Sequence, residues 1–267
     1  MNALLLLLLD SRAPAGAHHH SAGMEAAVGT GLVTGLASLE DFCQARLRTS
    51  ARVSAGFAAA SARVQAQAAE RAVGLAIPGR DTEPDREPGA GPRRDQEQQA
   101  RERWAREQWA RDQWGQLEAE FEARTPSEAM RMASRQLGGA LVRLLRSVLP
   151  EADVVTPWTL GTGPAPHHPI VLGAGVARAG GTPELAARAA ALAACAGPAS
   201  AAVRLLGLDP FAVQALLARL APGVDECAAV AAAAAAGPPS ALPADAAPAL
   251  DLLADYHLTA EVRLFAS

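Results

Sequence analysis

The sequence predicts an all-α fold: one compact domain of about eight to ten helices over residues 1–267. Composition is the first reason. Half of the residues are hydrophobic but only 4% are aromatic, and alanine and leucine supply most of the apolar count. Both favour helices, whereas isoleucine and the aromatic residues, which favour strands, are scarce. The second reason is a series of apolar segments that begin at capping residues and end at proline or glycine.

The apolar run Leu4–Leu9 predicts a first core helix. It precedes Ala13-Pro14-Ala15, a combination that superficially resembles a secretory signal and its cleavage site. However, no basic residue precedes the run, and six leucines are short for the apolar core of a signal. We therefore expect a cytoplasmic protein.

Capping residues and prolines divide the rest of the chain into further helices. Ser38 and Asp41 form a capping-box pattern, and Thr125 followed by Pro126 is a typical helix start. Gly197-Pro198 is expected to kink or break the helix in which it lies. The expected segments are one long helix over 38–76, then 125–149, a helix from about 169, 182–206 with the break, one from 209, an alanine-rich helix over 224–236, and 248–264.

Residues 79–116 form a low-complexity insertion rich in Pro, Gly, Arg, Asp, Glu and Gln. Its first half, 79–92, is expected to be disordered. The second half can be helical and repeats tryptophan every five residues, at Trp104, Trp109 and Trp114. A step of five residues turns a helix by about 500°, so these tryptophans cannot share one face. We expect a tolerated insertion, with a partner contact through the tryptophans as the alternative.

Several function classes are excluded or disfavoured. The formal charge of −4 argues against nucleic-acid binding, and every basic residue is Arg, which excludes a P-loop or Schiff-base lysine. Motifs of hydrolases, zinc peptidases and nucleotide-binding enzymes are absent from the sequence, so we expect no enzyme. Glycine, proline and arginine interrupt each candidate membrane span. The three widely separated cysteines, Cys43, Cys195 and Cys227, are expected to be buried and reduced.

Two histidine clusters were considered as metal sites. His18-His19-His20, together with Glu25, could bind a divalent metal such as nickel or zinc through imidazole nitrogens. The alternative is a loop whose histidines contact backbone, solvent or a partner, and we favour it because no further ligands stand at suitable spacing. His167-His168 precedes Pro169 and is expected to cap a helix.

Five segments resemble motifs of the urease accessory protein F (UreF) family. The stretch from Pro14 to Glu25 resembles the family signature at Pro14, Gly16, His20, Ser21, Gly23 and Glu25, and departs from it at His18, where most members have Phe or Tyr. The other four follow in family order: Ser134-Arg135-Gln136-Leu137-Gly138, His168-Pro169-Ile170-Val171-Leu172-Gly173, Ala201-Ala202-Val203-Arg204-Leu205, and the C-terminal Arg263-Leu264-Phe265-Ala266-Ser267. Only the insertion lies outside this pattern.

The resemblance implies a non-catalytic scaffold for urease maturation. Family members are all-α and dimerise, bind a UreD/UreH-type accessory protein, and recruit the GTPase UreG, which brings nickel to the urease apoenzyme. The resemblance assigns partner binding to Arg263 with Leu264 and Phe265, and to Pro14, Gly16, His20, Ser21 and Glu25; Gly23, Arg135, Gly138 and Arg204 are structural motif positions. We expect no stably bound cofactor, no nucleic acid and no membrane, with nickel handled by the complex.

Two alternatives remain at this stage. In the first, the chain is a nickel-binding metallochaperone that uses His18 and His20. In the second, it stimulates GTP hydrolysis, with Arg263 acting as an arginine finger that stabilises the charge on the transferred phosphoryl group. A helical hydrolase is disfavoured because no nucleophile and base stand in a recognisable pattern.

Overall fold

A computed structural model describes residues 2–10, 21–73, 92–149, 156–159 and 163–258. These residues form helices and no strand, which confirms the all-α prediction. The helices are α1 (Ala3–Leu9), α2 (Met24–Gly29), α3 (Leu36–Arg48), α4 (Ser50–Val73), α5 (Pro92–Ala123), α6 (Glu128–Val148), α7 (His168–Arg178), α8 (Pro183–Leu206), α9 (Pro210–Ala234), the 3₁₀ helix η2 (Pro239–Ala241) and α10 (Pro248–Leu258).

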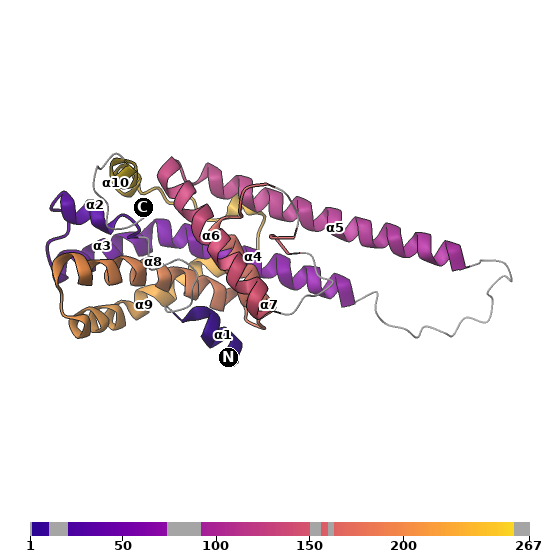
Figure 1. Ribbon diagram of the computed structural model, residues 1–267, viewed down its shortest axis with the longest axis horizontal. Coiled ribbons are helices and arrows are strands. Elements are labelled where there is room, and N and C mark those ends of the chain that lie inside the picture. Colours follow the sequence, from indigo (N-terminus) through magenta and orange to yellow (C-terminus); the bar gives the residue numbers. More distant parts are fainter. Residues whose placement is uncertain (1, 11–20, 74–91, 150–155, 160–162, 259–267) are drawn as a thin grey trace.

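Helix α4 is the centre of the bundle (Figure 1). It contacts α3, α5, α7, α8 and α9, and alanines and Phe57 form its buried face. The contact with α7 is close because Gly173 has no side chain: a Cβ there would lie 2.0 Å from the carbonyl oxygen of Ala58. Ser61 on α4 also donates a hydrogen bond to the carbonyl oxygen of Ile170 over 2.5 Å. Small residues therefore let the two helix backbones nearly touch.

Several helix boundaries differ from the expected ones. The long helix expected over 38–76 is two helices, which meet at Thr49, where the backbone leaves the helical region (φ −130°, ψ −106°). Conversely, α8 continues through Pro198, and α9 joins two expected helices through Pro222. Helix α6 is capped by Ser127 rather than Thr125: the Ser127 hydroxyl accepts a hydrogen bond from the backbone N–H of Met130.

Residues 92–116 are helical, as the sequence allowed for the second half of the insertion, but the expectation of a tolerated insertion needs a correction because Ala110 and Trp114 are buried. They belong to α5, which projects beyond the body of the bundle beside the end of α4 (Figure 1). Ala110, Trp114, Leu117 and Phe121 are buried at spacings of four, three and four residues, so the inner part of α5 has an apolar stripe that belongs to the core. Trp104 farther out is 64% exposed. Residues 79–91 lie outside the described residues.

Two other expectations concern the first helix and the candidate membrane spans. Helix α1 buries Leu5 and Leu8, as expected of a first core helix. Helix α8 is, by length and composition alone, apolar enough to cross a membrane, the single such helix in the described part of the chain. It packs against α2, α3, α4, α7 and α9, as core helices of a bundle do.

Candidate partner-binding site

The described end of the signature stretch is a tight turn into α2. Ala22 and Gly23 both have positive φ values, 50° and 85°, and Gly23 is the N-cap residue of α2. Glycine adopts this conformation without the steric cost that a Cβ imposes, which explains a glycine at the motif position. Ser21 is fully buried, and Glu25 lies in the first turn of α2, where a carboxylate stabilises the helix dipole.

A buried arginine on α3 fixes this turn. Arg46 is only 7% exposed, and its guanidinium donates to the carbonyl oxygens of Ala22 over 3.1 Å and of Ala194 on α8 over 2.8 Å. Its positive charge is 5.8 Å from the centre of the Phe42 ring. Arg46 therefore ties the signature turn to the middle of α8.

The second and third motifs pack directly on each other. Gly138 on α6 lies so close to the chain before α7 that a Cβ would be 1.9 Å from the carbonyl oxygen of Pro166. One turn earlier on α6, Arg135 donates to the carbonyl oxygen of Ala165 over 2.7 Å. The backbone N–H of His168 donates to the Ser134 hydroxyl over 3.2 Å. Hence the serine, arginine and glycine of the second motif all hold the start of the third.

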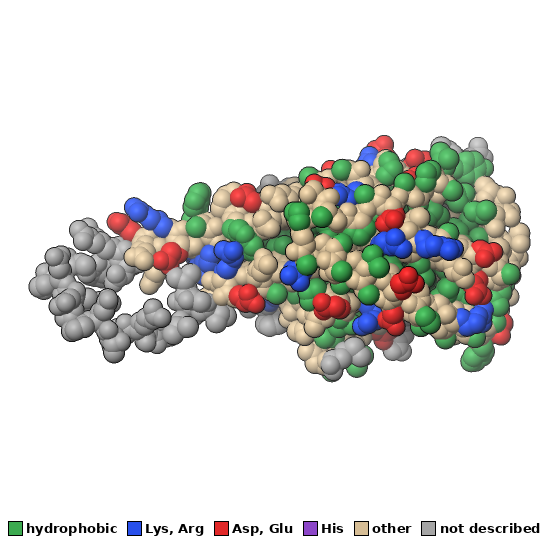
Figure 2. Space-filling model, turned by 180° about the vertical axis from the view of Figure 1, so that it is seen from behind, with side chains coloured by type: hydrophobic (Ala, Val, Ile, Leu, Met, Phe, Trp, Pro, Cys, Tyr) green, Lys and Arg blue, Asp and Glu red, His purple; other side chains and the backbone are tan. Residues whose placement is uncertain are grey.

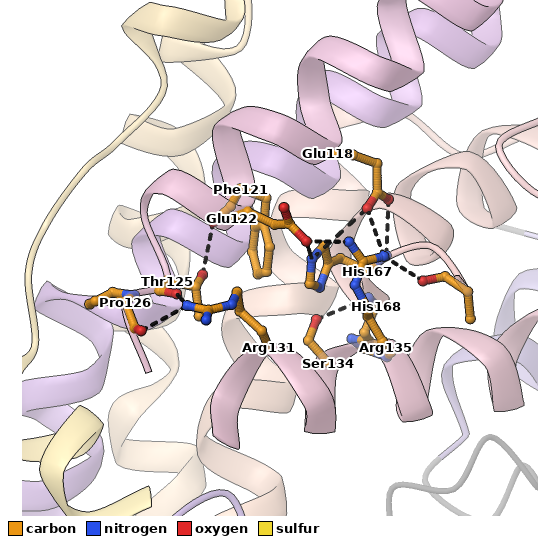
Figure 3. Close-up of polar contacts among 11 residues, drawn as sticks. Glu118, Phe121, Glu122, Thr125, Pro126, Arg131, Ser134, Arg135, His167 and His168 are labelled. Carbon is orange, nitrogen blue, oxygen red and sulfur yellow. Dashed lines mark hydrogen bonds and ion pairs between the residues drawn. The ribbon is translucent and has the colours of Figure 1, made fainter. Parts of the chain in front are cut away.

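A cluster of charged side chains surrounds this junction (Figure 3). Arg135 pairs with Glu118, at 3.2 Å, and with Glu122, both from α5. Glu118 also accepts a hydrogen bond of 3.0 Å from the backbone N–H of His167. The His167 ring is fully buried, 4.6 Å from the Phe121 ring between centres, and its Nε2 is 3.6 Å from a Glu122 oxygen. The cluster joins α5 and α6 to the chain before α7.

Burial and the neighbouring charges set the protonation states of this cluster. Burial, followed by the positive charge of Arg135, lowers the pKa of His167 to about 4, so the ring is neutral near pH 7. Burial raises the pKa of Glu118, whereas the hydrogen bond from Arg135 lowers the pKa of Glu122, which is more exposed. The cluster thus combines a neutral imidazole with one arginine that pairs with two carboxylates.

The motif segments meet again around a cavity of about 460 Å³. Helices α4, α6, α8 and α10 and the end of α5 form most of its wall, which is mainly alanine and other apolar side chains. The charged residues in this wall are Arg46, Arg124, Asp245 and Asp251. The lining residues that belong to the first three motifs are Ala22, Gly23, Ser134, Leu137, His168 and Pro169. Segments more than a hundred residues apart in the sequence thus share one concave surface.

The expected site residues that the structure describes fall into three groups. Ser21, Gly23 and Glu25 lie at the signature turn, and Arg135 and Gly138 hold the α6–α7 junction. Arg204 lies apart from both, on the exposed side of the last turn of α8, whereas Ala201 and Ala202 of the same motif are buried. Several expected residues lie outside the described part of the chain: Pro14, Gly16, His18, His20, Arg263, Leu264 and Phe265.

The described residues do not form a group of three or more His, Cys, Asp or Glu side chains able to hold a metal ion.

His167 occupies the N-cap position of α7, as expected, but its side chain makes no capping hydrogen bond. On the face drawn in Figure 2, positive and negative side chains alternate among apolar ones without a continuous basic surface.

Sequence reasoning missed Arg46, Glu118 and Glu122. Arg46 looked like one of many arginines on a helix, and the two glutamates follow a charged insertion that was treated as separate from the core. Their spacing of four residues places both on one face of a helix, which is the available signal. Their common partner Arg135 comes from another helix, so the cluster itself depends on the fold.

Comparisons with known proteins identify the family of this chain. The UreF family model matches residues 33–221. The protein named urease accessory protein UreF from Mycolicibacterium vanbaalenii is 39% identical over 267 residues, 99% of this chain and 98% of the relative. The proteins of the same name from Mycobacterium marinum and Mycobacterium sp. (strain JLS) are each 38% identical, over 99% and 98% of this chain and 98% and 97% of their own. This chain therefore belongs to the UreF family.

Proposed function

We propose that this protein is a urease accessory protein: a non-catalytic, cytoplasmic scaffold that acts in urease maturation. Relatives of that name are similar to this chain over nearly their whole length, which supports the general role. One structural observation supports a partner-binding function in particular. Residues of three family motifs, far apart in the sequence, lie in the wall of one mainly apolar cavity.

In the proposed function, a UreD/UreH-type accessory protein binds at this cavity. A concave, apolar surface with a few charged groups suits the insertion of a partner segment that buries apolar side chains and pairs its polar groups. Helix α10 supplies Leu250 and Ala254 to the wall, and the chain continues from its end towards Arg263.

The GTPase UreG is recruited in the next step, through Arg263 with Leu264 and Phe265. Arginine offers a planar fork of five donors that suits recognition of carboxylates or phosphates at an interface. Nickel is the cargo of the assembled complex, which delivers it to the urease apoenzyme, and the scaffold acts as a homodimer within that complex. Stable nickel binding by the isolated chain is not part of the proposal.

Co-purification with the cognate UreD-type and UreG-type proteins tests the proposal. Wild-type protein is expected to elute with both partners in size-exclusion chromatography, and Arg263→Ala to lose only the GTPase. Ala193→Glu tests the cavity, because Ala193 is an exposed residue of α8 in the cavity wall. A carboxylate there places an unpaired charge against an apolar partner segment and should abolish binding of the UreD-type protein.

Ala218→Glu is the matched control, since Ala218 is exposed on α9 and lies outside the cavity lining. It should bind both partners as the wild type does. Equal binding of the UreD-type protein by Ala193→Glu and Ala218→Glu would refute the cavity as the docking surface. If wild-type protein bound neither partner, the scaffold proposal would fail. Stimulated GTP hydrolysis in the wild-type complex that Arg263→Ala abolishes would add an arginine finger to the scaffold role.

A further inference from the structure

Two of the three cysteines face each other across the contact between α3 and α8. The Cys43 thiol lies 3.9 Å from the carbonyl oxygen of Cys195, and the Cys195 thiol lies 3.8 Å from the carbonyl oxygen of Cys43. Both side chains are 0% exposed, and the pair is reduced in this structure. The contacts are reciprocal, so neither thiol points away from the other residue.

These contacts bring each sulfur close to the backbone of the opposite cysteine. A carbonyl oxygen lies about 2.4 Å from the Cα of its own residue, so each sulfur is within about 6 Å of the opposite Cα. A disulfide joins Cα atoms about 5.5–6 Å apart, so the bond forms when the two sulfurs turn towards each other and α3 and α8 hold their Cα atoms at that spacing. Ala191, one turn before Cys195, is also fully buried, and its small side chain allows the close approach of the two helices.

We propose that Cys43 and Cys195 are an oxidative modification site, at which a peroxide converts the two thiols into a disulfide that joins α3 to α8. The bond would close next to Arg46, the α3 residue that holds both the signature turn, through Ala22, and α8, through Ala194. The disulfide would therefore restrict movement of α3 relative to α8, the two helices that Arg46 connects next to the cavity. This inference does not depend on which partner the cavity binds.

The reaction balances with hydrogen peroxide as the oxidant. The Cys43 thiolate attacks one peroxide oxygen, which breaks the O–O bond and gives a sulfenic acid, while the other oxygen leaves as water once protonated. The Cys195 sulfur then attacks the sulfenic sulfur. The S–S bond forms, the S–O bond breaks, and a second water leaves with the thiol proton. Two thiols are oxidised and one peroxide is reduced to two waters.

The surroundings indicate which thiol reacts first. The hydrogen bond from Cys195 lowers the pKa of the Cys43 thiol against the opposing effect of burial, and nearby Arg46 lowers it further. The same interaction raises the pKa of Cys195, which acts second. Arg46 follows Cys43 by three residues on α3 and also lines the cavity, whereas both thiols are fully buried behind it.

The test is thiol counting after exposure of the full-length reduced protein to hydrogen peroxide. The protein is denatured, alkylated without reductant and analysed by intact mass and peptide mapping. We expect alkylation to fall from three cysteines to one and a linked peptide pair that contains Cys43 and Cys195. The thermal midpoint should rise on oxidation and return to its starting value with a reductant, because the bond closes a long loop.

Variants identify the pair. Cys227→Ala removes the third buried cysteine, on α9, and should leave the cross-link and the rise in midpoint unchanged. Cys43→Ala and Cys195→Ala should each abolish both, while circular dichroism reports whether they fold. Three alkylatable thiols in oxidised wild-type protein, or a linked peptide that contains Cys227, would overturn the site. A cross-link without a rise in midpoint would overturn the locking of α3 to α8.

Discussion

Substituting Gly138 by alanine should disrupt the junction between the second and third motifs. The added Cβ would lie 1.9 Å from the carbonyl oxygen of Pro166 and 3.1 Å from the backbone nitrogen of His168. Both neighbours are backbone atoms, so no side-chain rotation relieves the overlap. Helix α6 and the chain before α7 would have to separate by more than 1 Å to restore ordinary van der Waals contact.

The expected loss follows from the contacts that this separation breaks. Overpacking in a buried contact costs about 1–3 kcal/mol. The hydrogen bond from Arg135 to the carbonyl oxygen of Ala165 adds about 1.5–3 kcal/mol, because its donor is charged. Alanine returns up to about 1 kcal/mol through its better helix propensity. The net destabilisation is about 4 kcal/mol, which lowers the thermal midpoint of a chain of this size by roughly 10 °C.

Thermal unfolding followed by circular dichroism measures this loss, with Gly115→Ala as the control. Gly115 is also a helical glycine, on α5, and a Cβ there meets no atom within 4 Å. The control should stabilise the protein by about 0.5–1 kcal/mol through helix propensity alone. A Gly138→Ala midpoint within about 2 °C of wild type would refute the reasoning, because the two segments would then separate without loss.

Two further predictions concern α5 and its contacts. Trp114→Ala should lower the free energy of unfolding, measured by chemical denaturation, by about 3–5 kcal/mol because this side chain is 3% exposed. Trp104→Ala should change it by less than about 0.5 kcal/mol because Trp104 is 64% exposed. Similar losses in the two variants would contradict the assignment of inner α5 to the core. The lowered pKa of His167, about 4 against 6.5 unfolded, means that the unfolded state takes up the proton first, so stability falls as the pH drops from about 6.5 towards 4. Between pH 7 and pH 5 the free energy of unfolding of the wild type should fall by about 2 kcal/mol more than that of His167→Gln. Equal decreases in the two proteins would show that folding does not lower the pKa of His167.

The starts of α8 and α9 could be predicted from sequence because they depend on local chemistry. Thr182 and Asp209 cap α8 and α9 through side-chain oxygens, as their position before proline indicated. The interruptions could not be predicted in the same way. Pro198 is buried within a continuous α8, so tertiary packing outweighs the hydrogen bond that proline cannot make. The break at Thr49 is marked by neither proline nor glycine in the sequence.

The low-complexity insertion illustrates why composition can locate a charged segment but not its boundary with the core. The tryptophans recur every five residues, and this repeat conceals a second pattern in which Ala110 and Trp114 continue to Leu117 and Phe121. That stripe crosses residue 116, where the charged composition ends, so no change in composition marks it. Phe121 then contacts both Phe57 on α4 and His167 before α7.

The same reasoning applies to the candidate site. Each motif indicated that its residues matter, but the order of motifs along the chain carries no information about distance in space. Gly138 lets the backbone of α6 lie against the chain before α7, and Gly173 lets the backbone of α7 lie against α4. At either contact an added Cβ would overlap a backbone carbonyl oxygen. Those two approaches place the start of α7 against both helices and bring His168 and Pro169 into the cavity wall. A substitution at either glycine should therefore alter the cavity without replacing a lining side chain, so Gly138→Ala protein that still folds should bind the UreD-type partner more weakly than Gly115→Ala.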